Sequence, residues 1–348
     1  MMRINSRMAP EVLAISPSVE TGKLGICHLK RLWSKSLAKR NGTIASDQFG
    51  DEWTIDVTLM SAVGIGIEQT LQYLFGKSPS FDEFENWVLS INGGMIAEER
   101  ITTFNAIILG NSTPKDSPDT VRVLTDADIA FWNENGYIVI HDSVSQENCL
   151  SAEQAIWDFL EMEKSDSSTW YKAHPAQQGI MVQFFQHPSL QTNRDSERIR
   201  KAFEELWGTQ DLWCNTDRVS FNPPETEHYT FPGPRLHWDV SLELPIPLGL
   251  QGILYLTDTA ADQGALTVVP GFQNRIGDWI NSLPPHTNPR NENIEALGAK
   301  PIAGKAGDFI IWHQALPHGS RPNTNILPRI AQYICWQPVE PEIKGKWK

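Results

Sequence analysis

The sequence has little cysteine, and its cysteines are not arranged to bind a metal or to form a disulfide framework. Only four occur in 348 residues, and none forms a CxxC pair. A zinc site built from cysteines and a disulfide-stabilised scaffold are therefore both disfavoured. The reducing cytoplasm is the compartment that we expect.

Long apolar runs and an excess of basic residues are also missing. No run approaches the roughly 20 apolar residues that span a bilayer, and the N-terminus lacks the apolar core of a signal peptide. The 29 Lys+Arg stand against 42 Asp+Glu, which gives a formal charge of −13. This balance disfavours nucleic acid and anionic membranes as partners. We expect a protein that acts on small molecules.

The first third of the chain has two textures. Residues 1–50 are rich in turn residues, and their basic stretch, which includes Lys30, Arg31 and Lys35, shows no clear period, so we expect part of this segment to be disordered. Residues 51–115 carry apolar residues at helical steps and predict a small module of three helices, one of them begun by Ser80 and Glu83 as a capping box. Polar residues at 110–120 mark the expected boundary.

Residues 121–340 have a different pattern. After a capped helix and a β-branched strand come short runs of apolar and aromatic residues between turn signals, at 218–222, 249–257, 265–270, 308–313 and 329–337. Such runs predict a sandwich or barrel, and the metal-binding pattern described next favours a double-stranded jelly roll. The predicted fold is therefore a β-rich α+β protein, a jelly-roll core with flanking helices, plus the small N-terminal helical module.

Three residues have the pattern of a metal site. In an extended strand, His237 and Asp239 would share one face, although roughly half a His-x-Asp occurrence is expected by chance. His318, in the turn after a later strand, adds a second imidazole. Two imidazoles and one carboxylate form the facial triad of non-heme iron(II) oxygenases, but they also suit zinc or manganese.

Arg329 follows the last of these residues at the start of an apolar strand. A guanidinium in such surroundings needs an anionic partner, and its planar fork suits a carboxylate. From the residues alone, a bound ligand and a structural ion pair are equally good interpretations.

From about Leu124 to Pro338 the chain resembles the phytanoyl-CoA dioxygenase family of iron- and 2-oxoglutarate-dependent oxygenases. The stretches that carry the resemblance are LTDADIAFWNENGYIVI, LHWD, ADQGALTVVPGFQ and GDFIIWHQALPHGSRPN, followed by Arg329. The resemblance implies that His237, Asp239 and His318 bind Fe(II), and that Arg329 and Ser320 bind 2-oxoglutarate. It also implies reaction with O2 on a small-molecule or carrier-bound substrate. Because Asp239 is present, where related halogenases carry a small residue, hydroxylation or another oxidation is the expected outcome.

Other residues have more than one interpretation. Gln183 and Arg235 are candidate substrate contacts, but a structural amide and a rim ion pair explain them equally well. His313 is a second candidate for the ligand role of His318. The alternation of residues along the strand and the family pattern both favour His318. Asn222 stands where family members often carry a lysine.

Two other functions remain open. One is a metalloenzyme of cupin type that does not use 2-oxoglutarate, and the other is a catalytically silent binding or scaffold protein. We interpret the helical module as packing on the catalytic domain, with docking or oligomerisation as a hypothesis.

Overall fold

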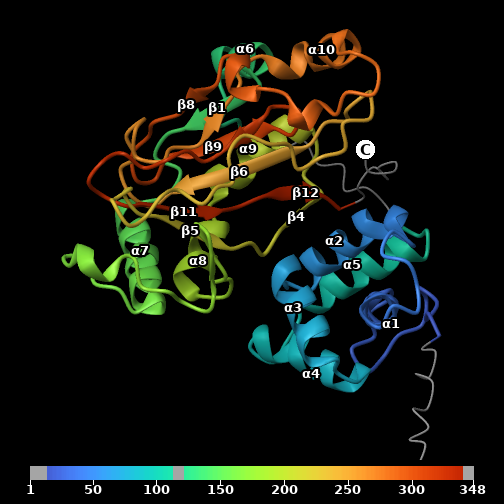
Figure 1. Ribbon diagram of the computed structural model, residues 1–348. Coiled ribbons are helices and arrows are strands. Elements are labelled where there is room, and N and C mark those ends of the chain that lie inside the picture. The colour runs from blue at the N-terminus through green and yellow to red at the C-terminus, as the bar shows by residue number, and fades with distance from the viewer. Residues whose placement is uncertain (1–13, 113–120, 340–348) are drawn as a thin grey trace, which may run out of the picture. The chain divides into compact units, whose positions relative to one another are not determined.

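The computed structural model describes residues 14–112 and 121–339, in two compact units that divide at Thr113 and Pro114 (Figure 1). Part of the segment expected to be disordered, residues 1–13, and most of the expected linker, residues 113–120, lie outside the described residues. Each unit is described by itself below.

The N-terminal unit is helical. Its elements are α1 (Leu29–Arg40), the 3-10 turn η1 (Gly50–Glu52), α2 (Trp53–Ala62), α3 (Ile67–Lys77), α4 (Phe81–Ile91) and α5 (Glu98–Ile108). Helix α1 packs against α3 and α4, and α2 packs against α5. The predicted capping box begins α4, where the backbone N–H of Ser80 donates to the Glu83 carboxylate at 2.7 Å.

This unit differs from the prediction in two places. The basic stretch forms α1, which the lack of a clear period did not predict. The described part of residues 51–115 contains four helices rather than three, because the helical conformation is interrupted between α2 and α3. At this break Gly64 has φ +70°, a conformation that glycine adopts without strain, and the Asn92 amide donates to the carbonyl of Val63.

Buried charge joins three elements of this unit. The side chain of Lys35 on α1 is 3% exposed, and its ammonium lies 2.8 Å from the Glu52 carboxylate and 2.7 Å from that of Asp56. Arg31 donates to both oxygens of Glu52, and His28 Nε2 lies 3.0 Å from Asp56. We call these five residues the Lys35 cluster.

The C-terminal unit is a mixed α/β structure around a large antiparallel sheet. Its helices are α6 (Asp126–Asn135), α7 (Gln146–Leu160), α8 (Pro188–Arg194), α9 (Glu197–Trp207) and α10 (Ile276–Ser282), with 3-10 turns η2 (Ser167–Thr169), η3 (Phe272–Asn274), η4 (Pro289–Asn291) and η5 (Ile294–Leu297). Its strands are β1 (Tyr137–Ile140), β2 (Gln177–Gln178), β3 (Met181–Val182), β4 (Leu212–Cys214), β5 (Val219–Asn222), β6 (Leu250–Tyr255), β7 (Thr267–Val268), β8 (Lys300–Pro301), β9 (Phe309–His313), β10 (His318–Gly319), β11 (Arg329–Tyr333) and β12 (Trp336–Pro338).

Seven strands form the large sheet in the order β1-β9-β6-β11-β5-β3-β2, and β9, β6 and β11 run side by side through its middle (Figure 1). A second sheet has the order β10-β7-β8, and β12 pairs with β4. The predicted helix at the entrance is α6, capped by Thr125 with Asp128 and ended by Gly136 at φ +72°.

The two faces of the large sheet have separate cores. In β9, Phe309 and Ile311 contribute to the core that includes α7 and α9. Their neighbours Ile310 and Trp312 contribute to the other core, with Val268 of the small sheet. Successive residues of a strand point to opposite faces of the sheet, and here both faces are buried. The candidate site lies on the side of the second core, where the two sheets face each other.

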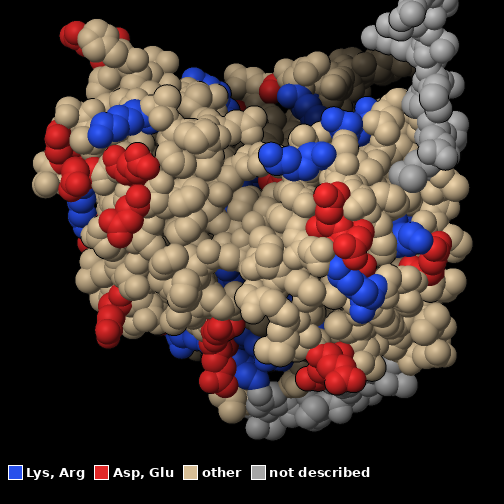
Figure 2. Space-filling model, turned by 90° about the horizontal axis from the view of Figure 1, so that it is seen from below, with Lys and Arg blue, Asp and Glu red and all other residues tan. Residues whose placement is uncertain are grey.

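No helix among the described residues is long and apolar enough to cross a membrane. Acidic and basic side chains are interspersed over the face that Figure 2 presents.

Candidate metal centre

The first two candidate ligands lie in a long loop between β5 and β6, residues 223–249, which we call the ligand loop. The predicted extended strand through Arg235, His237 and Asp239 is wrong, since only His237 forms a bridge, through two backbone hydrogen bonds with His318 of 2.9 and 3.0 Å. Several prolines remove N–H donors from this loop, which prevents a regular ladder. Gly319 allows the close approach, because a Cβ there would collide with the Arg235 carbonyl.

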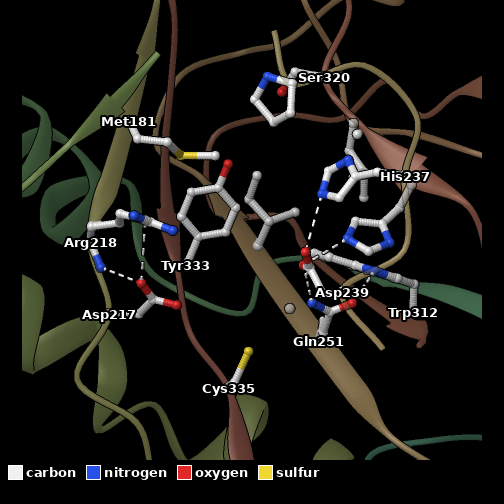
Figure 3. Close-up of a pocket in the computed structure, with 16 residues that line it drawn as sticks. Met181, Asp217, Arg218, His237, Asp239, Gln251, Trp312, Ser320, Tyr333 and Cys335 are labelled. Carbon is white, nitrogen blue, oxygen red and sulfur yellow. Dashed lines mark hydrogen bonds and ion pairs between the residues drawn. The ribbon is translucent and has the colours of Figure 1, made fainter. Parts of the chain in front are cut away.

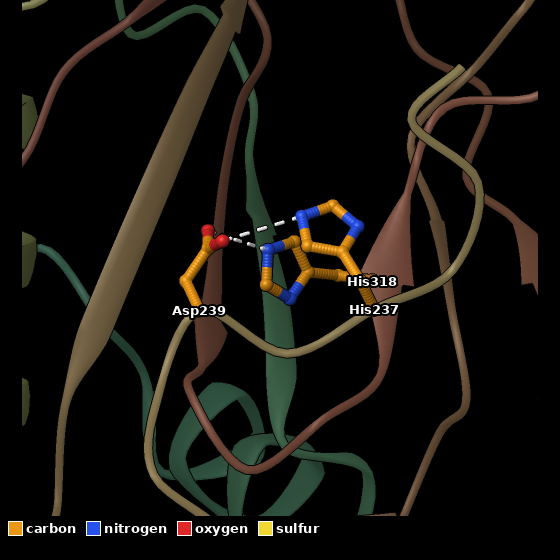
Figure 4. Close-up of side chains that lie close together, drawn as sticks. All are labelled: His237, Asp239 and His318. Carbon is orange, nitrogen blue, oxygen red and sulfur yellow. Dashed lines mark hydrogen bonds and ion pairs between the residues drawn. The ribbon is translucent and has the colours of Figure 1, made fainter. Parts of the chain in front are cut away.

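The bridge brings three side chains together (Figure 4). His237 Nε2 lies 3.3 Å from Asp239 Oδ1, and His318 Nε2 lies 3.2 Å from Asp239 Oδ2. The ligand atoms of all three residues lie within 4.8 Å of one another. His318 is nearly buried, whereas the side chain of Asp239 is 54% exposed, so the group is accessible from one side.

The hydrogen bonds of the two imidazoles fit a metal ion. His237 Nδ1 lies 2.7 Å from the Arg235 carbonyl, and His318 Nδ1 lies 3.2 Å from that of Leu316. With a cation bound between both rings and the carboxylate, the single N–H of each neutral imidazole would lie on Nδ1 and point to the backbone, which leaves the lone pair of Nε2 for the cation. Metal-binding histidines are held in this way.

The same packing sets the pKa of two ligands. Burial disfavours the charged form of Asp239, but hydrogen bonds from His237 and His318 outweigh burial and hold its pKa well below the usual range. Burial likewise lowers the pKa of His237, and the interaction with Asp239 reverses the sign, so the net shift is upward. A site that keeps a carboxylate ionised beside two imidazoles attracts a divalent cation.

Neighbouring side chains hold Asp239 in place. Gln251 donates to Asp239 Oδ2 at 2.9 Å, and Trp312 donates to Gln251 at 3.0 Å (Figure 3). Arg290 donates to the carbonyls of Trp238 and Val240, the two neighbours of Asp239 in the chain, at 2.7 and 2.6 Å. The carboxylate and its backbone are therefore both fixed from outside the triad.

Arg329 begins β11 and is fully buried. Its Nη2 donates to the Ser320 hydroxyl at 2.9 Å and its Nη1 to that of Ser220 at 3.1 Å, while Nε has no hydrogen-bond partner. Among the described residues no carboxylate lies within ion-pair distance of it. Ser320 follows His318 by two residues, so the guanidinium of Arg329 lies next to the group formed by His237, Asp239 and His318.

The family model for phytanoyl-CoA dioxygenase (PhyH) matches residues 132–331, more than half of the chain. The chain belongs to the phytanoyl-CoA dioxygenase family. A protein of Dictyostelium discoideum that carries the assignment phytanoyl-CoA dioxygenase is 26% identical over 255 residues, which cover 59% of this chain and 73% of the relative. The expected family and the expected class of dioxygenase are therefore confirmed.

Solved structures with similar folds have low sequence identity. The carbocyclase SnoK from nogalamycin biosynthesis, described as non-heme and α-ketoglutarate dependent, is 19% identical with a TM-score of 0.44, over 64% of this chain and 87% of SnoK. EctD from S. alaskensis with bound Fe is 18% identical with a TM-score of 0.49, over 66% of this chain and 83% of EctD. EctD has also been crystallised with 2-oxoglutarate. Fe(II), 2-oxoglutarate and O2 are the cofactors used by this family.

A cavity of about 110 Å³ in this phytanoyl-CoA dioxygenase domain lies against the triad. Ser320 lines the cavity, whereas the two candidate substrate contacts do not. Arg235 is exposed, and Gln183 lies beyond Met181, the residue of β3 that does line it. Their role in binding substrate stays a prediction that this geometry does not favour.

Two further residues of the family comparison have structural partners. The backbone N–H of Ala315 donates to His313 Nδ1, and burial lowers the pKa of His313 to about 4, as suits a packed neutral imidazole. Asn222, in place of the lysine, pairs with Arg329 across β5 and β11 and donates to the carbonyl of Arg321 at 3.1 Å. Neither side chain lines the cavity.

Part of the cavity wall was not predicted from the sequence. The residues not anticipated there include Met181, Asp217, Arg218, Tyr333 and Cys335. Asp217 and Arg218 directly precede β5, and nothing in an adjacent Asp and Arg distinguishes them from a surface pair before the pairing of β5 is known.

Proposed function

We propose that this protein is an Fe(II)- and 2-oxoglutarate-dependent hydroxylase of a small-molecule or carrier-bound metabolite, with succinate and CO2 as co-products. His237, Asp239 and His318 would hold the iron, and Arg329 with Ser320 would bind the distal carboxylate of 2-oxoglutarate. We also propose that the catalytic domain spans residues 121–340 and is a jelly roll, of which the seven-stranded and three-stranded sheets would form the two walls.

The observation that carries this proposal is the buried, uncompensated charge of Arg329. A buried guanidinium is strongly destabilising unless it is paired, and here it meets two hydroxyls and no described carboxylate. A dicarboxylate next to the triad supplies the missing negative charge. The planar guanidinium of arginine suits the binding of a carboxylate, and the Ser320 hydroxyl lies beside it.

The residues divide the chemistry between them. Iron bound to the triad supplies the activation of O2 that is coupled to oxidative decarboxylation of 2-oxoglutarate. One oxygen atom of O2 would enter succinate, and the other would be inserted into a C–H bond of the substrate to give a hydroxyl group. Asp239 would occupy one position on the metal, which favours hydroxylation over transfer of a halide. Arg329 and Ser320 fix the cosubstrate in one orientation.

The test is an anaerobic titration of the full-length protein with Fe(II) and then with 2-oxoglutarate. We expect the visible absorption of iron-bound 2-oxoglutarate, and slow succinate formation when O2 is admitted. The His318→Ala variant should lose both signals, whereas the His228→Ala variant, a change at an exposed histidine of the ligand loop, should keep both.

Two results would contradict the proposal. Tight Fe(II) binding without the 2-oxoglutarate absorption would indicate a metalloenzyme that does not use this cosubstrate. Absence of Fe(II) binding by the wild-type protein would indicate a catalytically silent relative.

We also propose that residues 51–115 form a separate helical module that mediates docking or oligomerisation. Deletion of residues 1–115 checks this proposal. A truncated protein that keeps the oligomeric state and full activity of the complete chain would contradict it.

A further inference from the structure

A carboxylate faces the candidate metal centre from the opposite wall of the cavity. Asp217 and Arg218 lie on one side of this cavity, and His237 and Asp239 lie on the other (Figure 3). The side chain of Asp217 is 39% exposed. Neither the metal centre nor the proposed 2-oxoglutarate site uses it.

The hydrogen bonds of Asp217 leave one oxygen available. Its Oδ1 accepts from the backbone N–H of Arg218 at 2.7 Å and lies 3.9 Å from Arg218 Nε. Its Oδ2 has no hydrogen-bond partner among the described residues and points away from Arg218, into the cavity (Figure 3). One oxygen is thus bound within the protein, and the other faces the space where a substrate would lie.

The backbone beneath this carboxylate is fixed. Arg194 is 3% exposed, and its Nη2 donates to the carbonyl of Asp217 and to that of Phe185, both at 2.8 Å. Strand β5, which begins two residues after Asp217, is held between β3 and β11. Asp217 is therefore held by rigid elements, as binding residues are.

The carboxyl group of Asp217 is partly desolvated, and a cation beside it would complement the charge of its ionised form. Burial raises the pKa of its carboxyl; Arg218 and Arg194 oppose this effect, Asp239 adds to it, and the net direction is upward. A cation beside Oδ2 would stabilise the charged form. Tyr333 and Trp312 line the same cavity and provide aromatic surface, which also attracts cations.

We propose that Asp217 is the residue that recognises the substrate, and that the substrate is a small molecule with an ammonium group. The ammonium group binds Asp217 Oδ2, and the carbon to be oxidised then faces the metal triad across the cavity. This inference rests on the proposed function, because it uses the triad as the oxidising centre.

The test uses full-length protein loaded anaerobically with Fe(II) and 2-oxoglutarate, and two probes of nearly equal shape, cyclohexylamine and cyclohexanol. Calorimetry measures the affinity of each. We expect wild-type protein to bind the amine at least tenfold more tightly than the alcohol. The Asp217→Asn variant should lose this preference, and Asp217→Glu should recover part of it. Asp278→Asn, a change at an exposed carboxylate on α10, should leave it unchanged.

The absorption of iron-bound 2-oxoglutarate, recorded on the same samples, keeps the two proposals separate. If this absorption is absent in wild-type protein, the proposed function fails. If it is present but the amine and the alcohol bind equally, or if Asp217→Asn keeps the preference, the assignment of Asp217 is overturned. Tighter binding of cyclohexanecarboxylate than of cyclohexylamine would also overturn it and would indicate Arg218. An Asp217→Asn variant that keeps the absorption is folded, so its loss of preference is interpretable.

Discussion

Lys35 in the N-terminal unit and Arg329 in the C-terminal unit are both buried cations, but their charges are balanced differently. Lys35 lies between the carboxylates of Glu52 and Asp56, at 2.8 and 2.7 Å. Arg329 donates only to the hydroxyls of Ser220 and Ser320. The first charge is neutralised within the fold, and we propose that the second binds a ligand.

This difference separates a structural charge from a functional one. Transfer of a charged side chain from water to the protein interior is unfavourable by several kcal/mol unless a partner compensates for it. The Lys35 cluster meets this requirement by joining α1, η1 and α2. Arg329 does not meet it from the described residues. An uncompensated buried charge beside a metal triad is therefore a better indicator of function than burial of charge alone.

The largest effect that we expect is on stability, from Lys35→Met. This change leaves Glu52 and Asp56 without their shared buried partner, which destabilises by about 3–5 kcal/mol. Chemical denaturation followed by helical circular dichroism measures the loss. The control is Lys77→Met, at an exposed position of α3. Equal stability of the two variants would show that the Lys35 cluster is not structurally important.

The opposite result is expected for Arg329→Met. Because this change removes the uncompensated guanidinium, the variant without 2-oxoglutarate should be as stable as the wild-type protein or more stable. Affinity for 2-oxoglutarate should fall about 100-fold, which corresponds to ~2.7 kcal/mol and to the loss of a charge-assisted bidentate contact. Anaerobic titration and thermal unfolding, with Arg122→Met as a surface control, check both parts. A marked loss of stability with unchanged affinity would make Arg329 a structural residue.

The sequence predicted which residues meet at the candidate site better than it predicted their backbone. His237, Asp239 and His318 could be picked out because their order and spacing resemble one family, and the structure brings them together. The strand expected beneath the first two is absent because prolines interrupt the ligand loop, and a single bridge to His318 replaces it. Residue types thus carried information that local periodicity did not.

Two other features depend on tertiary contacts and could not be predicted. Helix α1 was missed because its lysines and arginines suggest solvent, whereas Lys35 is buried against carboxylates of the next elements. Asp217 was missed because only the pairing of β5 with β3 and β11 places it at the cavity. In both cases the partner residues are distant in sequence or belong to other elements.

A smaller effect is expected at the metal centre itself from Arg290→Ala. The guanidinium holds the carbonyls on both sides of Asp239, and loss of such an outer contact weakens metal binding about 10-fold. Competition with a chelator measures the affinity for Fe(II). Arg275→Ala is the matched control, because Arg275 donates to the carbonyl of Leu297 and, among the described residues, to no carbonyl beside Asp239. If both variants bind Fe(II) like the wild type, Arg290 does not position the ligand.

The smallest effect that we expect is a pH dependence of stability that arises from Glu52 in the Lys35 cluster. Burial opposes ionisation of Glu52, but hydrogen bonds from Arg31 and Lys35 outweigh burial and lower its pKa from 4.5 to about 2. A lowered pKa in the folded state means that Glu52 stabilises the fold fully above pH 4.5 and loses this contribution as the pH falls toward 2. Wild-type protein should therefore be more stable than Glu52→Gln at pH 7, and thermal unfolding should show this advantage shrinking below pH 4.5. Because Lys35 keeps Asp56 as a partner in Glu52→Gln, the change should be about 1 kcal/mol, less than the pKa shift of Glu52 alone would give. A constant difference between the two proteins across this range would mean that the Glu52 ion pairs do not stabilise the unit, and that the Lys35 cluster is no better balanced than Arg329.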